Sequence, residues 1–358
     1  MKELIHKLAD GIDLSEGEMV DAMEAIMGGE ATHAQMAAFL TALRIKGETV
    51  AEITGAARVM REHATPIRVP RRPQPVVTVD REEINIDLET IVDTCGTGGD
   101  QTHTFNISTT TSFVIAGAGL QVAKHGNRAV SSRCGSADVL EMLGIRLDLS
   151  PDGVSRCLDE AGIAFMFAPA FHPAMKHAGP TRREIGVPTV FNILGPLTNP
   201  AGVRSLVLGV ARLSLLEQMA HVLKNLNCRH ALVVHGDDGL DEITITGATN
   251  VCEINNGTIT RYKICPQDFG METAKTGAVA GGTPEINMAI IKSILNGETG
   301  PRRDVVLMNA AAALFVGDAV SSIEEGILAA ARAIDCGEAA RTLGKMVEVS
   351  NRMGEVSG

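Results

Sequence analysis

The stretch Asp93-Thr94-Cys95-Gly96-Thr97-Gly98-Gly99-Asp100 follows a short β-branched run and precedes the polar run Asn106-Ile107-Ser108-Thr109-Thr110. This order predicts a strand, a glycine-rich loop and the first turn of a helix. Glycine lets the backbone approach a ligand closely, and free N–H groups at a helix N-terminus favour an anion. The spacing matches neither the GxGxxG dinucleotide fingerprint nor the GxxxxGK[ST] phosphate loop. A tight structural turn explains a lone Gly-Thr-Gly-Gly equally well, so the interpretation depends on the rest of the chain.

A second segment of the same character follows the strand-like run at residues 120–123. Lys124-His125-Gly126-Asn127-Arg128 supplies a cation and an amide, and the hydroxyls of Ser131, Ser132 and Ser136 follow before another predicted helix. A solvated basic turn is the weaker alternative. Two phosphate-binding loops at the ends of strands in one sheet predict a ligand with two separated phosphate groups.

The segment His235-Gly236-Asp237-Asp238-Gly239-Leu240-Asp241-Glu242 places four carboxylates after an apolar strand. Beside a phosphate site these carboxylates would repel the ligand unless a cation lies between them. Mg²⁺ suits that position because it prefers oxygen ligands and takes only one or two carboxylates. Asp241 and Glu242 are adjacent and point in different directions, so we expect them to serve two ions rather than chelate one. A solvated acidic loop is the alternative.

The segment from Phe167 to Pro200 combines an apolar stretch with two arginines. A semi-rigid apolar wall is expected from Pro169, Phe171, His172, Pro173 and Met175. Arg182 and Arg183 follow one to two helical turns later, and an arginine near an apolar slot suits a small carboxylate. Residues 192–200 are predicted to be a structural turn without chemistry. Neither a Ser-His-Asp set nor a Cys–His pair can be assembled, so no catalytic residue or general base is assigned.

The chain before residue 65 predicts a small all-helical unit. Three capping boxes open successive helices, since a side-chain oxygen and a Glu or Gln three residues later satisfy free N–H groups at each start. They are Ser15 with Glu18, Thr32 with Gln35 and Thr49 with Glu52. The proline- and arginine-rich stretch from Pro66 to Pro75 predicts an extended linker.

Beyond the linker, short β-branched runs alternate with helical patterns. This alternation indicates an α/β domain with a central, largely parallel sheet. We therefore expect a helical domain at 1–70, completed by helices near 172–200. A linker with an insertion at 71–90 and an α/β domain at 91–358 would follow.

The composition excludes several classes of protein. With a net charge of −11, nine Phe, one Tyr and no Trp, the 358 residues lack the basic face and stacking surface that a nucleic acid needs. No apolar stretch reaches the ~20 residues of a membrane span, and Met1–His6 shows no signal-peptide core. The seven cysteines are nowhere spaced as CxxC, so reduced thiols and a cytoplasmic location are expected.

Several motifs occur in order along the chain: GTGGD at 96–100, TFNISTT at 104–110, KHGNRAVSS at 124–132, GSADVLE at 135–141, HPAMKHA through FNILGPLTNP at 172–200, and HGDDGLDEIT at 235–244. Together with the N-terminal helices and Asn309-Ala310-Ala311, they resemble the anthranilate phosphoribosyltransferase family. The resemblance implies a homodimer with its active site between a helical and an α/β domain. It also implies Mg²⁺-dependent transfer of the phosphoribosyl group of 5-phosphoribosyl 1-diphosphate to the amine of anthranilate, with release of diphosphate, in tryptophan biosynthesis.

The resemblance further implies roles for individual residues. Phosphoribosyl diphosphate would be held by Gly96, Gly99, Asp100, Thr104, Asn106, Ser108, Thr109, Lys124 and Ser136. Magnesium, expected as two ions, would be held by Ser108, Asp241 and Glu242. Anthranilate would meet Gly96, Asn127 and Arg182, with His125, Pro169, His172 and Met175 lining its path.

The sequence departs from the family pattern at three places. Cys134 stands where a small hydroxyl residue is common, Pro188 stands where Arg is frequent, and the stretch between Pro70 and Ile91 is longer than usual. Two alternatives remain. A pyrimidine nucleoside phosphorylase shares the Lys124 segment, but it binds inorganic phosphate and needs neither a second phosphate loop nor Asp241 and Glu242. A non-catalytic relative that binds nucleic acid would need a basic face, which the net charge opposes.

Overall fold

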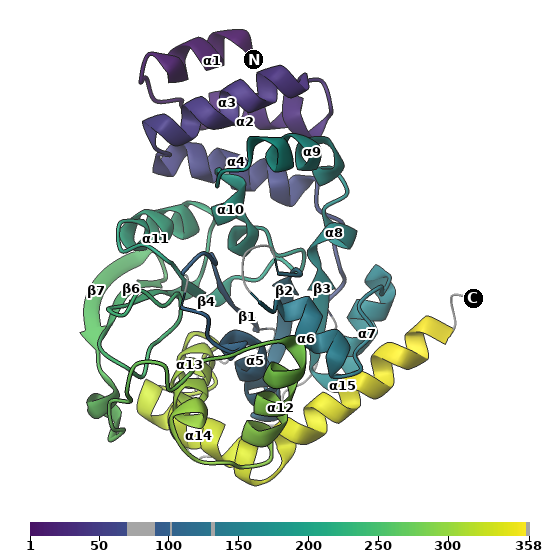
Figure 1. Ribbon diagram of the computed structural model, residues 1–358, viewed down its shortest axis with the longest axis vertical. Helices are drawn as coiled ribbons and strands as arrows, with labels where there is room; N and C mark the ends of the chain where they lie inside the picture. The colour runs from purple at the N-terminus through teal and green to yellow at the C-terminus, as the bar shows by residue number, and fades with distance from the viewer. Residues whose placement is uncertain (70–89, 101, 130–132, 356–358) are drawn as a thin grey trace.

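The computed structural model describes residues 1–69, 90–100, 102–129 and 133–355. A helical bundle stands above a larger α/β domain (Figure 1). The bundle begins with α1 (Lys2–Ala9), α2 (Glu16–Met27), α3 (His33–Lys46) and α4 (Val50–Glu62). Most of the predicted linker with its insertion, and Ser131 and Ser132 of the second phosphate segment, lie outside the described residues.

The three predicted capping boxes are confirmed at the starts of α2, α3 and α4. Ser15, Thr32 and Thr49 each accept a hydrogen bond from the backbone N–H three residues later, and the Glu or Gln there accepts one from the cap N–H in return. The apolar residues of these helices face inward and form one buried core. Local sequence therefore accounts for where each bundle helix begins and which face it buries.

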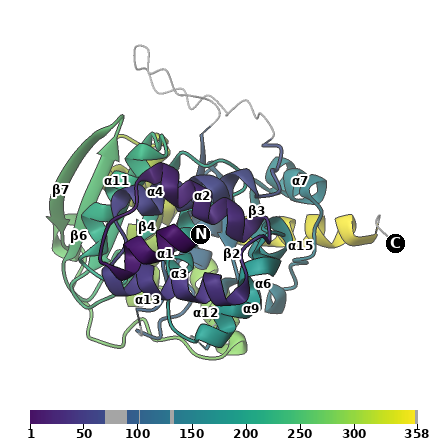
Figure 2. The same cartoon turned by 90° about the horizontal axis from the view of Figure 1, so that it is seen from above.

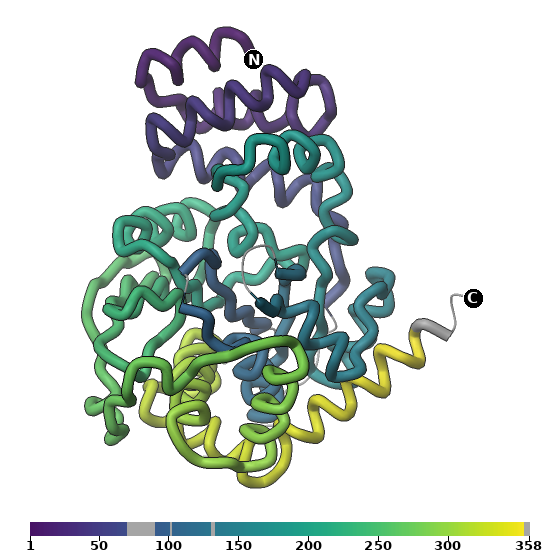
Figure 3. The backbone as a smooth tube through the Cα atoms, viewed as in Figure 1, coloured from purple at the N-terminus to yellow at the C-terminus, as the bar shows by residue number. Residues whose placement is uncertain are grey.

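A segment far along the chain returns to this bundle. It contains α8 (Ala168–Phe171), α9 (Met175–Ile185), α10 (Phe191–Leu194) and the 3₁₀ turn η1 (Gly195–Leu197). Helix α9 packs against α2 and α3, and α10 packs against α4 (Figure 3). His33 Nδ1 and Thr181 Oγ1 lie 2.6 Å apart across the α3–α9 contact. The segment that carries the predicted apolar wall and Arg182 is therefore attached to the bundle as well as to the sheet.

The α/β domain is built on a seven-stranded sheet in the order β3-β2-β1-β4-β5-β6-β7. Its strands are β1 (Ile91–Gly96), β2 (Gln121–Gly126), β3 (Ile163–Phe167), β4 (Ser205–Gly209), β5 (His230–Gly236), β6 (Thr249–Asn255) and β7 (Thr258–Ile264). Strands β1 to β5 pair in parallel, whereas β6 and β7 add an antiparallel hairpin beside β5. The predicted α/β class with a largely parallel sheet is confirmed.

Helices cover both faces of this sheet. On the bundle side lie α7 (Pro151–Ala161) and α11 (Leu215–Asn225). On the other side lie α5 (Ile107–Gly117), α6 (Ser136–Met142), α12 (Pro284–Leu295), α13 (Pro301–Val316), α14 (Ile323–Asp335) and most of α15 (Glu338–Glu355), with the short η2 turn (Pro266–Phe269) after β7. Successive strand residues alternate between the two cores, as Val122 and Ala123 of β2 show. Figure 2 shows the β6–β7 hairpin at one side of the molecule and α15 at the other.

No helix in the portion of the chain covered by the structure combines the length and apolar character needed to cross a bilayer.

Candidate active site

The parallel register brings the carboxyl ends of neighbouring strands to one edge of the sheet. Gly96 at the end of β1 lies opposite Gly209 of β4, which in turn lies opposite Val234 of β5. Loops that follow parallel strands open on the same side, where α/β proteins bind ligands. The glycine-rich loop, the Lys124 segment at the end of β2 and the acidic loop after β5 therefore meet at this edge.

The glycine-rich loop packs directly against Asp241. The Gly98 N–H donates to Asp241 Oδ2 at 2.7 Å. A Cβ at Gly96 would lie 2.2 Å from that oxygen, and one at Gly209 would lie 1.6 Å from the Asp241 carbonyl oxygen. Gly98 and Gly99 have φ values of +70° and +84°, which residues with side chains rarely adopt. The glycines are thus required by the close approach of the acidic loop as well as by the turn itself.

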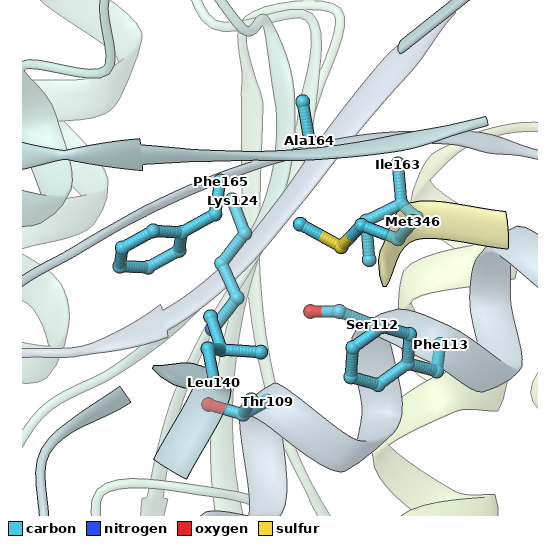
Figure 4. Close-up of a pocket in the computed structure, with 9 residues that line it drawn as sticks. All are labelled: Thr109, Ser112, Phe113, Lys124, Leu140, Ile163, Ala164, Phe165 and Met346. Atoms are coloured by element: carbon cyan, nitrogen blue, oxygen red, sulfur yellow. The ribbon is translucent and has the colours of Figure 1, made fainter. Parts of the chain in front are cut away.

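Glu242 contacts the N-terminus of α5. The Ser108 N–H donates to Glu242 Oε1 at 3.2 Å. Lys124, which is 3% exposed, donates from Nζ to Ser108 Oγ at 3.2 Å and to the Thr94 carbonyl at 2.9 Å. The stem of Lys124 lines a small pocket together with residues of α5 and β3 (Figure 4). The first turn of α5, the end of β2 and the acidic loop are therefore joined by charged groups.

The two carboxylates of the acidic loop are desolvated, with Asp241 9% and Glu242 8% exposed. Burial raises the pKa of Glu242 to about 7, against the opposing effect of Lys124. Burial, followed by repulsion from Asp100 and Glu242, raises the pKa of Asp241 well above its usual value. A divalent cation beside these groups would reverse both shifts, because it stabilises the ionised carboxylates.

The oxygen ligands offered by Asp241, Glu242 and Ser108 fit magnesium better than a metal that is coordinated by protein side chains alone. The described ranges contain no group of three or more His, Cys, Asp or Glu side chains placed to hold a metal ion. Asp241, Glu242 and the Ser108 hydroxyl would therefore be the protein's contribution. Mg²⁺ keeps several waters and is usually held by one or two carboxylates together with substrate phosphates.

Asn106 is held by residues that are distant in sequence. Asn287 of α12 donates from Nδ2 to Asn106 Oδ1 at 2.9 Å, and Asn106 Nδ2 donates to the Cys134 carbonyl at 3.1 Å. Thr104 forms a β-bridge with Ala280. Asn287 was not predicted, because a single Asn within a helical pattern carries no local signal that points to another loop.

Asn127 and Ser136 lie together after β2. Ser136 Oγ donates to the Asn127 carbonyl at 3.2 Å, and a Cβ at Gly126 would lie 2.3 Å from Ser136 Oγ. Asn127 is exposed, and its side-chain oxygen accepts the N–H of Arg128 at 2.8 Å. Arg128 pairs with Asp138 and with a second carboxylate of α6. The ammonium of Lys124, rather than the guanidinium of Arg128, is the cation of this segment that contacts the sheet edge.

His125 connects the sheet edge to the returning segment. Its ring centroid lies 5.0 Å from that of His172. His125 Nδ1 lies 3.3 Å from the Gly195 carbonyl, which can only accept, so this contact assigns the proton to Nδ1. Burial lowers the pKa of His125 to about 3 and that of His172 to about 4. Both imidazoles are therefore neutral at physiological pH.

The predicted apolar wall is only partly open. Pro169 and Pro173 are exposed and Met175 is half-buried. Phe171, at 1% exposure, belongs instead to the core shared with the bundle, and its carbonyl accepts the N–H of Thr65 at 2.8 Å. This corrects the expectation for Phe171: its size makes it a core anchor that supports the segment from behind.

Arg182 lies on α9 with its guanidinium carbon 5.0 Å from the centroid of the Phe191 ring. Burial lowers the pKa of Arg182, and within the described chain no acidic neighbour offsets this effect. A half-buried cation over an aromatic face is suited to receive a carboxylate.

Residues 192–200, predicted to be a structural turn, form the end of α10 and the η1 turn, and Asn199 has a structural role there. Its Nδ2 donates to Asp93 Oδ2 and to the Ala123 carbonyl, both at 2.8 Å. Asp93 is 1% exposed, and burial raises its pKa while Lys124 opposes the shift. Asn199 thereby joins β1 to β2 beside the candidate site. An Asn-Pro pair is a common turn signal, which concealed this contact in the sequence.

Known protein families match both parts of the chain. Residues 2–64 match the helical bundle domain of the glycosyl transferase family, and residues 88–340 match its a/b domain. The chain belongs to this glycosyl transferase family.

A full-length relative narrows the class. The anthranilate phosphoribosyltransferase of Trichlorobacter lovleyi is 53% identical over 351 residues, which cover 98% of this chain and 100% of the relative. The resemblance identified from the motifs is thereby confirmed.

Solved structures of the same class share the fold. The anthranilate phosphoribosyltransferase of Thermus thermophilus superposes with a TM-score of 0.87 at 41% identity, covering 97% of this chain and 99% of that one. The Saccharomyces cerevisiae enzyme in complex with PRPP and Mg gives a TM-score of 0.85 at 28% identity, covering 98% and 97%. That yeast enzyme has also been solved in complex with 4-fluoroanthranilate.

Proposed function

We propose that this chain transfers the phosphoribosyl group of 5-phosphoribosyl 1-diphosphate to the amine of anthranilate, in tryptophan biosynthesis. The products are N-(5-phosphoribosyl)anthranilate and diphosphate. One observation carries the proposal: the glycine-rich loop, Lys124 and the buried Asp241–Glu242 pair meet at one sheet edge, which His125 connects to the segment bearing Arg182. Full-length identity to anthranilate phosphoribosyltransferases supports the same reaction.

The sheet edge holds the donor. The remaining backbone N–H groups of the glycine loop and of the first turn of α5 would bind the diphosphate, and Lys124 adds a positive charge. The donor-binding residues are proposed to be Gly96, Gly99, Asp100, Thr104, Asn106, Ser108, Thr109, Lys124 and Ser136. Because these groups are positioned before substrate arrives, charge that develops on the leaving diphosphate is stabilised with little reorganisation.

Asp241, Glu242 and Ser108 would hold Mg²⁺, which we propose as two ions. When bound, the metal neutralises diphosphate and makes it a better leaving group. The close contact of Asp241 with Gly96, Gly98 and Gly209 fixes one carboxylate, and the N-terminus of α5 fixes the other.

The returning segment holds the acceptor. Arg182 is proposed to bind the anthranilate carboxylate, so that the neighbouring amine faces the ribosyl carbon. Gly96 and Asn127 would meet the ring from the sheet side, and His125, Pro169, His172 and Met175 would line its path. Attack from the face opposite the diphosphate inverts the anomeric carbon, and no side chain is assigned as a general base.

We also propose that the protein is a cytoplasmic homodimer. All seven cysteines are free, which agrees with a reducing compartment. Ile45 of α3 is 81% exposed and Ile12 of the α1–α2 loop is 51% exposed, so the bundle offers apolar side chains for self-association. The mass in solution, measured by light scattering, tests the dimer.

An activity assay tests the reaction. Purified protein is given Mg²⁺, anthranilate and 5-phosphoribosyl 1-diphosphate, and diphosphate release is measured with either substrate or the metal omitted. Release that requires both substrates and Mg²⁺ is expected. Phosphorolysis of uridine or thymidine without anthranilate-dependent release would instead identify a pyrimidine nucleoside phosphorylase. Nucleic-acid binding without turnover would identify the non-catalytic alternative.

A further inference from the structure

Asn309 of α13 lies fully buried, at 0% exposure, next to the acidic loop. Its Oδ1 accepts the Ile243 N–H at 3.0 Å, and its Nδ2 donates to the Ile243 carbonyl at 2.9 Å and to the Val305 carbonyl at 2.8 Å. These partners fix the orientation of the amide, because the N–H needs an acceptor and the carbonyls need a donor. Asn309 therefore holds both backbone polar groups of the residue that follows Glu242.

The acidic loop depends on such external partners. Residues 237–248 between β5 and β6 form turns and bends rather than a helix or strand. A buried backbone group without a partner costs ~1–3 kcal/mol, so the loop needs hydrogen bonds from elsewhere to stay in place. Near its apex, Asp238 accepts from Leu240 N–H and Thr244 Oγ1. At Ile243 the partner comes from a different element, α13.

The Asp241–Glu242 pair is constrained from two directions. From the sheet, Gly96 and Gly209 allow the loop to approach closely, and the Gly98 N–H holds Asp241 Oδ2. From α13, Asn309 holds Ile243, while the fully buried Ala310–Ala313 stretch keeps side chains small where the helix packs against the domain. Removing the sheet constraint or the amide would allow both carboxylates to move together.

We propose that Asn309 is a positioning residue for the Asp241–Glu242 pair. It acts through Ile243 and holds the two carboxylates in the place where they would bind the magnesium of the donor complex. The inference rests on the proposed function, since it assigns metal binding to Asp241 and Glu242. Partners of metal ligands typically contribute 10–100-fold to metal affinity when they orient a ligand.

Asn309→Leu tests this role, because leucine has the same branched arrangement of four side-chain heavy atoms and makes none of the three hydrogen bonds. Isothermal titration calorimetry measures the Kd for 5-phosphoribosyl 1-diphosphate in the presence of Mg²⁺, without anthranilate. We expect this Kd, and the Mg²⁺ concentration for half-maximal activity, to rise about tenfold or more, while the anthranilate KM changes less than about twofold.

Leu314→Ala is the matched control, since Leu314 is also almost fully buried on α13. It is expected to lower the Tm and leave the donor Kd unchanged. If Asn309→Leu does not fold, Asn309→Ser retains one hydroxyl in a smaller side chain and is expected to raise the Kd in the same direction. A lowered Tm with an unchanged Kd in the Asn309 variants, as in Leu314→Ala, would assign Asn309 a packing role and overturn the proposal.

Asp241→Asn separates this inference from the proposed function. Weaker donor binding in Asp241→Asn together with unchanged binding in the Asn309 variants would refute only the role of Asn309. Unchanged binding in Asp241→Asn, or no Mg²⁺-dependent binding by the unmodified protein, would refute the metal site on which the inference rests.

Discussion

The sheet edge and the α8–α10 segment hold their polar groups in opposite ways. At the edge, the Gly98 and Ser108 N–H groups already donate to the Asp241–Glu242 pair, and Lys124 donates to the Ser108 hydroxyl. In the segment, Arg182 lies over an aromatic ring and has no carboxylate partner among the described residues. His125 of β2 lies against His172 of this segment, and its buried Nε2 has no hydrogen-bond partner in the described part of the chain. The residues proposed to bind phosphoribosyl diphosphate are thus already held by other protein groups. The residues proposed to bind anthranilate have polar groups that are left to hydrogen-bond the substrate.

The two regions are also attached to different parts of the molecule. The edge belongs to the central sheet, and its loops are held by contacts between strands and α5. The segment packs on the bundle through α9 and α10. Substitutions in the two regions should therefore affect different substrates.

Gly209→Ala should have the largest effect, because the new Cβ would lie 1.6 Å from the Asp241 carbonyl oxygen. The acidic loop must move, and a misplacement of about 1 Å costs on the order of 10²-fold in rate. Steady-state kcat/KM for the donor measures the loss. Gly247→Ala in the same loop is the control, since nothing lies within 4 Å of its Cβ position in the described structure. Equal activity in the two variants would mean that the loop position does not matter.

Arg182→Ala should raise the anthranilate KM by roughly ten- to a hundredfold, since a hydrogen bond to a charged group contributes ~1.5–3 kcal/mol. The donor KM should stay nearly constant. The adjacent, exposed Arg183 supplies the control variant Arg183→Ala. Equal increases in both KM values would mean that Arg182 has a structural role. A larger increase of the anthranilate KM in Arg183→Ala would mean that Arg183 binds the carboxylate.

Lowering the pH should destabilise the acceptor side. The pKa of His172 is about 4 in the folded protein, below the ~6.5 of an unfolded histidine, so the unfolded state binds more protons between these values. The contribution of His172 to stability is complete above about pH 6.5 and falls as the pH drops toward 4. Urea unfolding measures the free energy of unfolding at each pH. Between about pH 7.5 and 5, this free energy should fall by about 1–2 kcal/mol less in His172→Gln than in the unmodified protein. Identical losses would show that His172 titrates normally.

Cys134→Ser should have the smallest effect. Burial raises the pKa of Cys134 to about 11, so the thiol is protonated and unsuited to nucleophilic chemistry. Its Sγ donates to Asn106 Oδ1 at 3.4 Å, a contact that a serine hydroxyl can replace. Activity at saturating substrate should be retained, and a loss of several orders of magnitude would contradict this.

Local patterns predicted much of the fold and the donor side. The capping boxes at Ser15, Thr32 and Thr49 located the bundle helices because caps are made by neighbours in sequence. Strand ends followed by Gly or acidic residues indicated the sheet edge, since parallel strands bring such ends together. The antiparallel β6–β7 hairpin was not predicted, although an Asn-Gly pair between two short β-branched runs is a hairpin signal and Asn256-Gly257 supplies one.

Residues that act across long sequence separations escaped prediction. Asn199, Asn287 and Asn309 each satisfy a partner on another element, and a single buried Asn has no periodic or local signature. Phe171 is predicted to line a semi-rigid apolar wall, whereas packing against the bundle buries it. Such assignments depend on which elements meet, which one-dimensional patterns do not encode.

The most direct test of the division between donor and acceptor sides is a crossed titration. Calorimetry measures the binding of 5-phosphoribosyl 1-diphosphate with Mg²⁺ to Arg182→Ala and to Asp241→Asn under the same conditions. We expect Arg182→Ala to bind the donor like the unmodified protein, within about twofold, and Asp241→Asn to bind it at least about tenfold more weakly and to need more Mg²⁺. Equal weakening in both variants, or none in Asp241→Asn, would contradict the division.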